Sequence, residues 1–237
     1  MLAVANNYRS LSHMYADPET YDGQDLSNIE LENGTFIQVV AVFCYLGSIL
    51  ARDCRDDADV TARIKAAGSA FGALRKCIFA STYISFDTKK IVYTALILSI
   101  LLYGSESWCL TDKLYHKLRL FHHRCIRAMC RVTRQHTREY HIRTMDLLTR
   151  VGLASLDTYV TKRQLRWAGH VARMDILRLP RKMLSSWVCH KRPRGAPQFT
   201  YGRGLLKALR KAGVNVAEWP VLAADRVKWR NIIDTII

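Results

Sequence analysis

Hydrophobic and polar positions follow two different patterns along the chain. Between residues 29 and 50, two β-prone runs flank Asn33-Gly34, a dipeptide typical of hairpins because a type I′ turn needs positive φ at both central residues. We therefore predict strands near 28–32 and 35–38, and a third at 42–46. Residues 1–28 are polar, acidic and weakly patterned, which predicts a poorly ordered lead-in.

Helical spacing begins near residue 57, where Val60, Ile64, Phe71, Leu74 and Ile78 recur at roughly helical intervals. Capping and proline signals predict the helices that follow. One begins at Asp87 and runs through 91–103, one runs from Asp112 to about 138, one runs from Ser155 or Asp157 through Met174, a short one contains Pro180, and the last covers Glu218–Ile236.

The predicted fold class is mainly α, with a small N-terminal β-hairpin element followed by about six helices. The predicted parts are the lead-in 1–28, a hairpin element at 29–56, a helical domain at 57–150, and a helical extension at 151–237 with a basic loop at 191–204.

Two observations bear on location. The longest apolar stretch, Ile91–Tyr103, is too short to span a bilayer, and the N-terminus lacks the pattern of a signal peptide. The seven cysteines are odd in number and form no CxxC pair, which is typical of reduced thiols. We expect an intracellular protein, nuclear or cytoplasmic, without a membrane segment.

Charge changes this picture most. The formal net charge is +16, but residues 1–59 hold three Arg and ten acidic residues, a net −7, so the remainder carries +23. A field of this size predicts a polyanionic partner, either nucleic acid or an anionic membrane surface. Membrane binding is disfavoured because the faces opposite the basic rows resemble core.

The basic residues are concentrated in an arginine row. Lys113 to Arg138 contains eight Lys or Arg and no acidic residue. Six of them recur at helical spacing: Lys117, Arg124, Arg127, Arg131, Arg134 and Arg138. On one continuous helix this face would run about 31 Å. The alternatives are a phosphate-binding face and a solvated surface, and an uninterrupted row of like charges favours phosphate.

A shorter row occurs at Arg163, Arg166, His170 and Arg173, and the 191–204 loop adds Arg194 and Arg203. Phe199 and Tyr201 in that loop could stack on unpaired bases.

The sequence also contains residues that could bind a metal or act in catalysis. Cys125, Cys130, His136 and His141 suggest zinc, but the two cysteines point about 140° apart on a continuous helix, so we predict no metal. His122 and His123 are predicted to face the duplex or solvent. No catalytic triad can be assembled, and Cys109 with His116 has no third partner.

Five motifs resemble the C-terminal part of non-LTR (LINE-like) retrotransposon reverse transcriptases. FCYLGS at 43–48 resembles F-x-YLGS, carried by Phe43, Tyr45, Leu46, Gly47 and Ser48. LYGSESW at 102–108 resembles LLYG-x-E-x-W, carried by Tyr103, Gly104, Glu106 and Trp108. FHHRCIR at 121–127 resembles FH-x-RCLR. LRWAGHVARM at 165–174 resembles LRW-x-GHV-x-RM, carried by Trp167, Gly169 and His170. Asp225, Arg226 and Trp229 match the terminal DR-x-x-W.

This resemblance implies a thumb and C-terminal extension that hold a primer–template duplex, RNA–DNA or DNA. The palm of such enzymes holds two Mg²⁺ ions with an aspartate and a Y/F-A-D-D turn, and YADP at 15–18 supplies only one aspartate. We therefore expect no catalytic residue, no cofactor and no polymerase or nuclease activity from this chain alone. The alternatives are a domesticated or decaying interaction fragment, and one piece of a split polymerase completed by a palm-containing polypeptide.

Overall fold

The computed structural model describes residues 29–30, 32–34, 36–37, 40–53, 55–185 and 201–236. The predicted lead-in at 1–28 lies outside them. The chain divides into two units, residues 1–41 with 185–198, and residues 42–184 with 199–237. The predicted class is confirmed, since the described residues are mainly helical and begin with a small β-hairpin.

The first unit contains the predicted hairpin. Strands β1 (Ile29–Glu30) and β2 (Phe36–Ile37) pair antiparallel. Gly34 has a φ of 75°, but Asn33 is not among the residues with positive φ, and the strands stop at Glu30 and Phe36. The hairpin is confirmed, whereas the two-residue type I′ turn at Asn33-Gly34 is wrong.

The second unit begins with a hairpin that contains this kind of turn. Strand β3 (Val42–Tyr45) pairs antiparallel with β4 (Ser48–Ala51). The two residues between them, Leu46 and Gly47, have φ values of 47° and 82°. Positive φ at both central positions is the type I′ requirement. The third strand was predicted, but β4 was missed because leucine is not a residue that signals such a turn.

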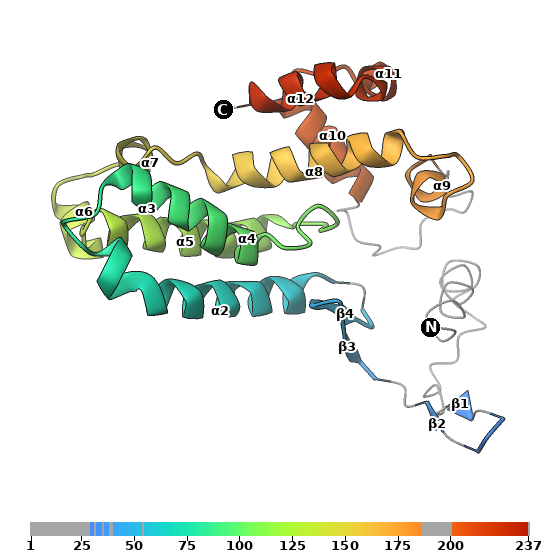
Figure 1. The fold of residues 1–237 in the computed structure, drawn as a ribbon, viewed down its shortest axis with the longest axis horizontal. Coiled ribbons are helices and arrows are strands. Elements are labelled where there is room, and N and C mark those ends of the chain that lie inside the picture. Colours follow the sequence, from blue (N-terminus) through green and yellow to red (C-terminus); the bar gives the residue numbers. More distant parts are fainter. Residues whose placement is uncertain are drawn as a thin grey trace. The chain divides into compact units, whose positions relative to one another are not determined.

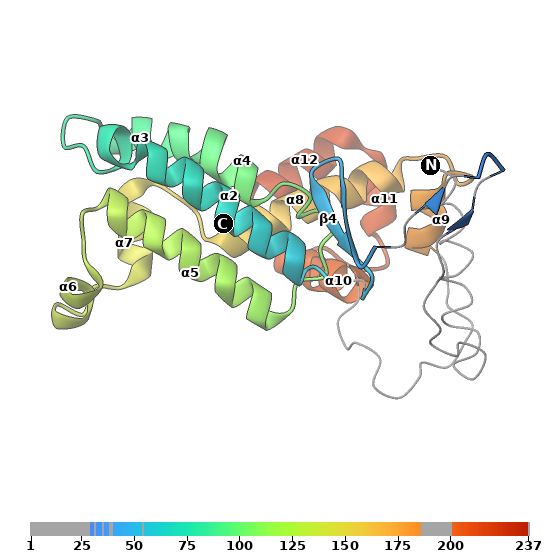
Figure 2. The same ribbon diagram turned by 90° about the horizontal axis from the view of Figure 1, so that it is seen from below.

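A helical bundle follows this hairpin (Figures 1 and 2). Its first part comprises α2 (Asp57–Leu74), the π-helical turn η1 (Arg75–Phe79), α3 (Phe86–Val92), a second π-helical turn η2 (Tyr93–Ile97) and α4 (Leu98–Leu101). Its second part comprises α5 (Asp112–Met129), α6 (Arg134–Glu139), α7 (Thr144–Val151) and α8 (Leu156–Ala172). Apolar faces of these helices form one core cluster, in which the rings of Phe71 and Phe79 stack with centroids 4.4 Å apart.

A second cluster is built on the far half of α8. Its helices are α9 (Leu179–Ser185), α10 (Tyr201–Lys211), α11 (Trp219–Ala224) and α12 (Arg226–Asp234). Leu165 and Ala168 of α8 pack with Leu209, Trp229 and Ile233 in this cluster. Helix α8 therefore lies between the first bundle on one side and α11 and α12 on the other (Figure 1).

Helix starts follow the hydroxyl residues rather than the neighbouring aspartates. The Ser85 hydroxyl caps α3 and Thr111 caps α5, so the predicted caps at Asp87 and Asp112 are wrong. Both aspartates lie in the first turn, where a negative charge favours the helix dipole. The predicted cap Ser155 is confirmed, since its side chain accepts from the Thr158 N–H at 3.2 Å.

Two C-terminal predictions need correction. The helix predicted at 218–236 is broken at Asp225, which is extended and caps α12 by accepting from the Val227 and Lys228 N–H groups. The loop predicted at 191–204 ends by residue 201, where α10 begins, and its earlier residues lie outside the described part. The short helix around Pro180 is confirmed as α9. None of the helices in the described residues has the length and apolar character needed to cross a membrane.

Candidate nucleic-acid interface

The predicted arginine row is divided between two helices and a turn. Lys117, Arg124 and Arg127 lie on α5, Arg131 lies in the turn, and Arg134 and Arg138 lie on α6. The prediction of one continuous helix from 112 to about 138 is therefore wrong, and so is the straight 31 Å face.

The interruption is a Schellman turn. Arg131 adopts the left-handed conformation with a φ of 58°. Its N–H donates to the Ala128 carbonyl at 3.2 Å, and the Val132 N–H donates to the Arg127 carbonyl at 2.9 Å. Thr133 then caps α6. Sequence spacing did not reveal this turn because the residue with positive φ is an arginine, where glycine is usual.

We call the five arginines at the end of α5, in the turn and on α6 the α5–α6 surface: Arg124, Arg127, Arg131, Arg134 and Arg138. Four are exposed and Arg127 is half-buried. Within the described part of the chain, no carboxylate forms an ion pair with any of the five. Partial burial and the charges of Arg134 and Arg124 lower the pKa of Arg127, so Arg134 lies near Arg127 despite the turn.

The first half of α5 is different, because two of its basic residues, Lys117 and Arg119, are paired with carboxylates. Lys117 lies 4.0 Å from the Asp57 carboxylate. The Arg119 guanidinium donates to both oxygens of Asp157, with a distance of 2.8 Å from its Nε. Of the predicted row, Lys117 is therefore set apart from the α5–α6 surface.

His122 does not face outward. It is fully buried, its Nδ1 lies 2.9 Å from the Tyr93 hydroxyl, and its Nε2 lies 3.2 Å from the Ala154 carbonyl. A carbonyl can only accept, so Nε2 carries the proton and Nδ1 accepts from Tyr93. Burial lowers the pKa of His122 to about 4. The prediction that His122 faces duplex or solvent is wrong, whereas His123 is half-exposed.

The cysteines considered for zinc belong to the core. Cys125 and Cys130 are both buried, and burial raises the pKa of Cys125 to about 12, which disfavours the thiolate that binds metal. His136 and His141 are exposed. In the part of the chain that the structure describes, no three His, Cys, Asp or Glu side chains gather closely enough to hold a metal ion.

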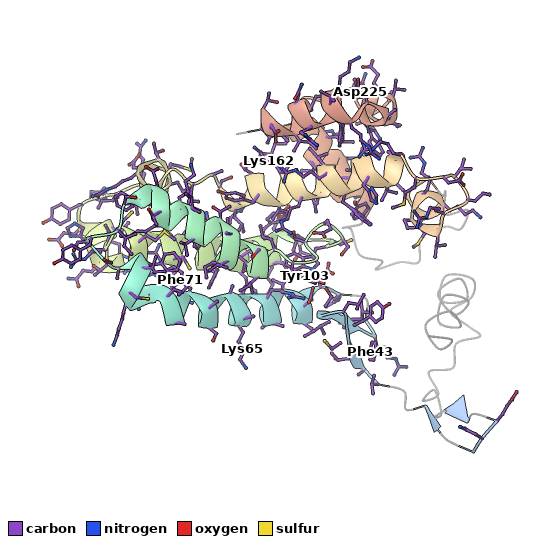
Figure 3. The ribbon with its side chains drawn as sticks, in the orientation of Figure 1. Phe43, Lys65, Phe71, Tyr103, Lys162 and Asp225 are labelled. Carbon is purple, nitrogen blue, oxygen red and sulfur yellow. The ribbon has the colours of Figure 1, made fainter. Side chains whose placement is uncertain are left out.

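The motifs at 43–48 and 102–108 meet at the N-terminal end of α2 (Figure 3). The Tyr103 hydroxyl donates to the Leu46 carbonyl at 2.9 Å. The Arg63 guanidinium donates to the Gly47 carbonyl and lies 4.3 Å from the centre of the Tyr103 ring. A Cβ on Gly104 would lie 3.0 Å from the Ser48 hydroxyl. These contacts hold the β3–β4 turn.

Asp59 of α2 connects the same two motifs through hydrogen bonds to its buried carboxylate. Its carboxylate is buried and accepts from the Trp108 indole N–H at 2.9 Å and from the Ile49 N–H at 3.0 Å. Glu106 lies 3.8 Å from Arg163 of α8. Trp108 and Glu106 therefore connect parts of the fold, whereas Phe43 and Tyr45 lie on the exposed hairpin with their rings stacked on each other.

The motif on α8 forms the contact with α12. A Cβ on Gly169 would lie only 2.1 Å from Nε1 of Trp229, so glycine is required for this close packing. The Trp229 indole donates to the Leu165 carbonyl at 2.9 Å, which fixes the register of the two helices. Trp167 is half-buried, with its ring 5.5 Å from that of the exposed His170.

The second predicted basic row is also divided. Arg163 points into the protein, where it donates to the Leu102 carbonyl at 3.0 Å and pairs with Glu106. Arg166 and Arg173 instead reach the last helices: Arg166 lies 3.5 Å from Asp234, and Arg173 donates to the Ala223 carbonyl at 2.5 Å.

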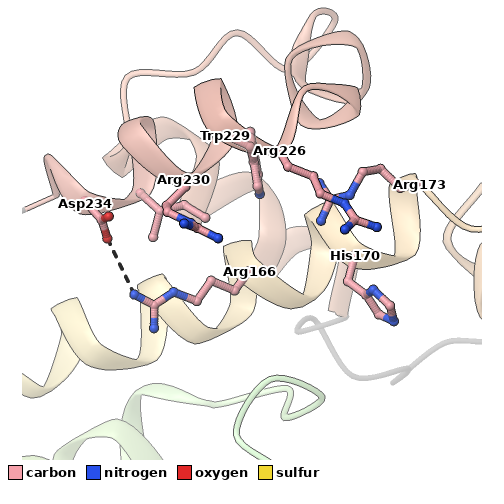
Figure 4. A pocket seen from close by; sticks show the side chains of 8 residues that line it. Arg166, His170, Arg173, Arg226, Trp229, Arg230 and Asp234 are labelled. Atoms are coloured by element: carbon pink, nitrogen blue, oxygen red, sulfur yellow. Dashed lines mark ion pairs between the residues drawn. The ribbon is translucent and has the colours of Figure 1, made fainter.

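Two arginines of α12 complete this region: Arg226, which belongs to the DR-x-x-W motif, and Arg230, which belongs to no motif and to neither predicted basic row. Arg226 and Arg230 of α12 line a groove with Arg166, His170 and Arg173 of α8 (Figure 4). We call it the α8–α12 groove. The available signal was the four-residue spacing of Arg226 and Arg230 on either side of the motif residue Trp229.

Only some of the binding residues predicted in the 191–204 loop lie in the described part of the chain. Arg194 and Phe199 lie outside the described residues. Arg203 is exposed on α10. Tyr201 is partly buried against the second core cluster, and burial raises its pKa to about 12. Its stacking on bases stays a prediction.

Comparison with known proteins gives one indication of origin. No protein-family model matches the chain, and no solved structure matches it. An uncharacterized transposon-derived protein of Caenorhabditis elegans is 28% identical over 234 aligned residues, which cover 94% of this chain and 79% of that protein. The chain is thus related to a transposon-derived protein.

Proposed function

We propose that this chain binds a nucleic-acid duplex through the α5–α6 surface. The observation that carries the proposal is five arginines close in sequence without a carboxylate partner among the described residues, whereas Lys117 and Arg119 earlier on α5 are paired. Guanidinium groups bind phosphate oxygens in bidentate geometry, and an anionic backbone would offset the repulsion among the five charges. The transposon-derived relative supports a nucleic-acid context.

The finer proposal is that the chain acts as the thumb and C-terminal extension of a LINE-like reverse transcriptase. The ordered motifs support it, and the primer–template duplex, RNA–DNA or DNA, is the expected ligand. We assign no catalytic step and no cofactor to this chain, because no pair of aspartates in it matches the palm motif that holds Mg²⁺ in that family.

The direct test is to titrate a labelled duplex at several salt concentrations. Five phosphate contacts predict a slope of about −4.5 in log affinity against log salt for B-form DNA. Replacing Arg127, Arg131 and Arg134 with Glu should reduce the magnitude of the slope by about 2.7, since three contacts are lost.

A matched variant controls for net charge. Lys65, Arg75 and Lys76 are exposed on α2 and η1, and their replacement with Glu makes the same charge change elsewhere. This control should bind more strongly than the α5–α6 variant. Equal losses in the two variants, or a wild-type slope near zero, would reject the proposed interface.

A second candidate function is supported by the β3–β4 hairpin. Val42, Phe43, Tyr45, Leu46 and Leu50 are between 47% and 76% exposed, and exposed apolar groups of this kind mark protein contacts. A palm-containing polypeptide would then cover the hairpin as part of a split polymerase. Primer extension should require both polypeptides, and replacing Phe43 and Leu46 with Ser should weaken their association. Extension by this chain alone would contradict the assignment.

A further inference from the structure

The groove between α8 and α12 has the features of a second anion site. Four guanidinium groups line it, from Arg166, Arg173, Arg226 and Arg230, and among the described residues that line it only Asp234 has a carboxylate. Asp234 lies beside Arg166 at one end, 3.5 Å away. The charge of the other three arginines is therefore not balanced by a residue of the groove.

Packing brings these charges together. The missing side chain at Gly169 lets Trp229 lie against α8, and the indole hydrogen bond to Leu165 sets the register. In this register, Arg226 and Arg230 lie one helical turn apart, on either side of Trp229, and face the outer residues of α8. The close helix contact thus forces like charges from two distant segments into one groove.

Arg173 contributes hydrogen-bond donors to the wall of the groove. Its guanidinium gathers with that of Arg226 above His170 (Figure 4). One amino group donates to the Ala223 carbonyl, but the Arg173 Nε is buried without a hydrogen-bond partner among the described residues. Burial and the nearby charge of Arg226 lower the pKa of Arg173. An oxyanion in the groove would accept from these donors and offset the repulsion.

We propose that the α8–α12 groove binds phosphate groups, as a site separate from the α5–α6 surface. Phosphate suits it because the donors are arginines converging from two helices, and a tetrahedral oxyanion can accept from several guanidinium groups at once. The source of the phosphate is either the nucleic-acid backbone or a free polyphosphate. This inference adds a site to the proposed function and stands without it.

The test uses the full chain with Arg226 and Arg230 replaced by Gln. Both residues are exposed, so the variant should fold as the wild type does, as circular dichroism would verify. The matched control is Lys65→Gln with Arg75→Gln, which removes the same charge from α2 and η1. The probes are a labelled duplex with 5′-hydroxyl ends, titrated at several salt concentrations, and inorganic tripolyphosphate, followed by thermal unfolding.

If the nucleic-acid backbone supplies the phosphate, the magnitude of the salt slope for the duplex should fall by about 1.8 in the groove variant and should not change in the control. If a free polyphosphate is the ligand, tripolyphosphate should raise the melting temperature of the wild type and of the control but not that of the groove variant. If tripolyphosphate stabilises the wild type and the control but not the groove variant, and the wild type does not bind the duplex, the groove site stands and the proposed duplex function is rejected. A groove variant that matches the control with both probes overturns the inference.

Discussion

The α5–α6 surface and the α8–α12 groove are both arginine clusters, but the chain builds them in different ways. The first comes from residues 124–138, which are close in sequence. The second joins α8 to α12, whose arginines are more than fifty residues apart. Local spacing is enough to reveal the first cluster, whereas the second depends on one helix contact. The two clusters should therefore respond differently to the same kind of substitution.

The largest expected effect is that of Gly169→Ala. The added methyl group would meet the Trp229 ring, whose Nε1 lies 2.1 Å from the Cβ position. Overpacking of this kind should lower the free energy of unfolding by about 3 kcal/mol. Urea denaturation would measure the loss. The salt slope should fall to that of the α5–α6 surface alone, since only the groove depends on this contact.

Gly72→Ala is the matched control for that substitution. Gly72 is also a helical glycine, but no atom lies within 4 Å of its Cβ position. Alanine should stabilise α2 by about 0.5–1 kcal/mol and leave duplex binding unchanged. Comparable stability of the two alanine variants would mean that the Gly169–Trp229 contact does not hold the groove.

The two arginine clusters also lie over different hydrophobic cores, and the stability of these cores should depend on pH in different ways. The core beneath α5 contains His122, whose pKa burial lowers to about 4 from an ordinary value of 6.5. The folded state favours the neutral ring, so this stability is complete above pH 6.5 and is lost as the pH falls toward 4. Between pH 7 and pH 5 the loss should be about 2 kcal/mol.

Unfolding in urea at pH 7 and pH 5 would measure this loss. His122→Gln should be less stable at pH 7 but should lack the His122 part of the pH dependence. His136→Gln removes an exposed histidine and should keep the wild-type dependence. If His122→Gln and the wild type lose the same stability on acidification, the buried ring is not the titrating group.

Much of the fold could be predicted because it follows from local signals. The β1–β2 hairpin, the start of α8 at Ser155 and the short helix at Pro180 all depend on residues adjacent in sequence. The errors occurred where a local rule was satisfied by an unusual residue. Leucine occupies the positive-φ turn before β4, and arginine occupies the turn that ends α5, so neither position carried its usual glycine signal.

The sites were less predictable than the fold, because side-chain partners are set by packing. Arg163 shares the helical spacing of Arg166, yet its guanidinium donates to the Leu102 carbonyl and pairs with the Glu106 carboxylate. Neither Arg226 nor Arg230 forms part of a basic row in the sequence, because their charged neighbours in the groove come from a distant segment. Spacing identifies a face of a helix, but only the fold determines what that face contacts.

The smallest expected effect tests the turn that divides the arginine row. Arg131 has a φ of 58°, a conformation that costs a non-glycine residue about 1 kcal/mol or more. Arg131→Gly should therefore raise the free energy of unfolding by about 1 kcal/mol while removing one phosphate contact, a change of about 0.9 in the salt slope. Stability and duplex affinity would then move in opposite directions, which urea denaturation and the salt titration would measure together.

Arg138→Gly removes the same charge from within α6 and should instead destabilise by about 1 kcal/mol, because glycine disfavours a helix. If Arg131→Gly is destabilising to the same extent, residues 127–134 form a continuous helix and the α5–α6 surface is the straight row that spacing alone predicts.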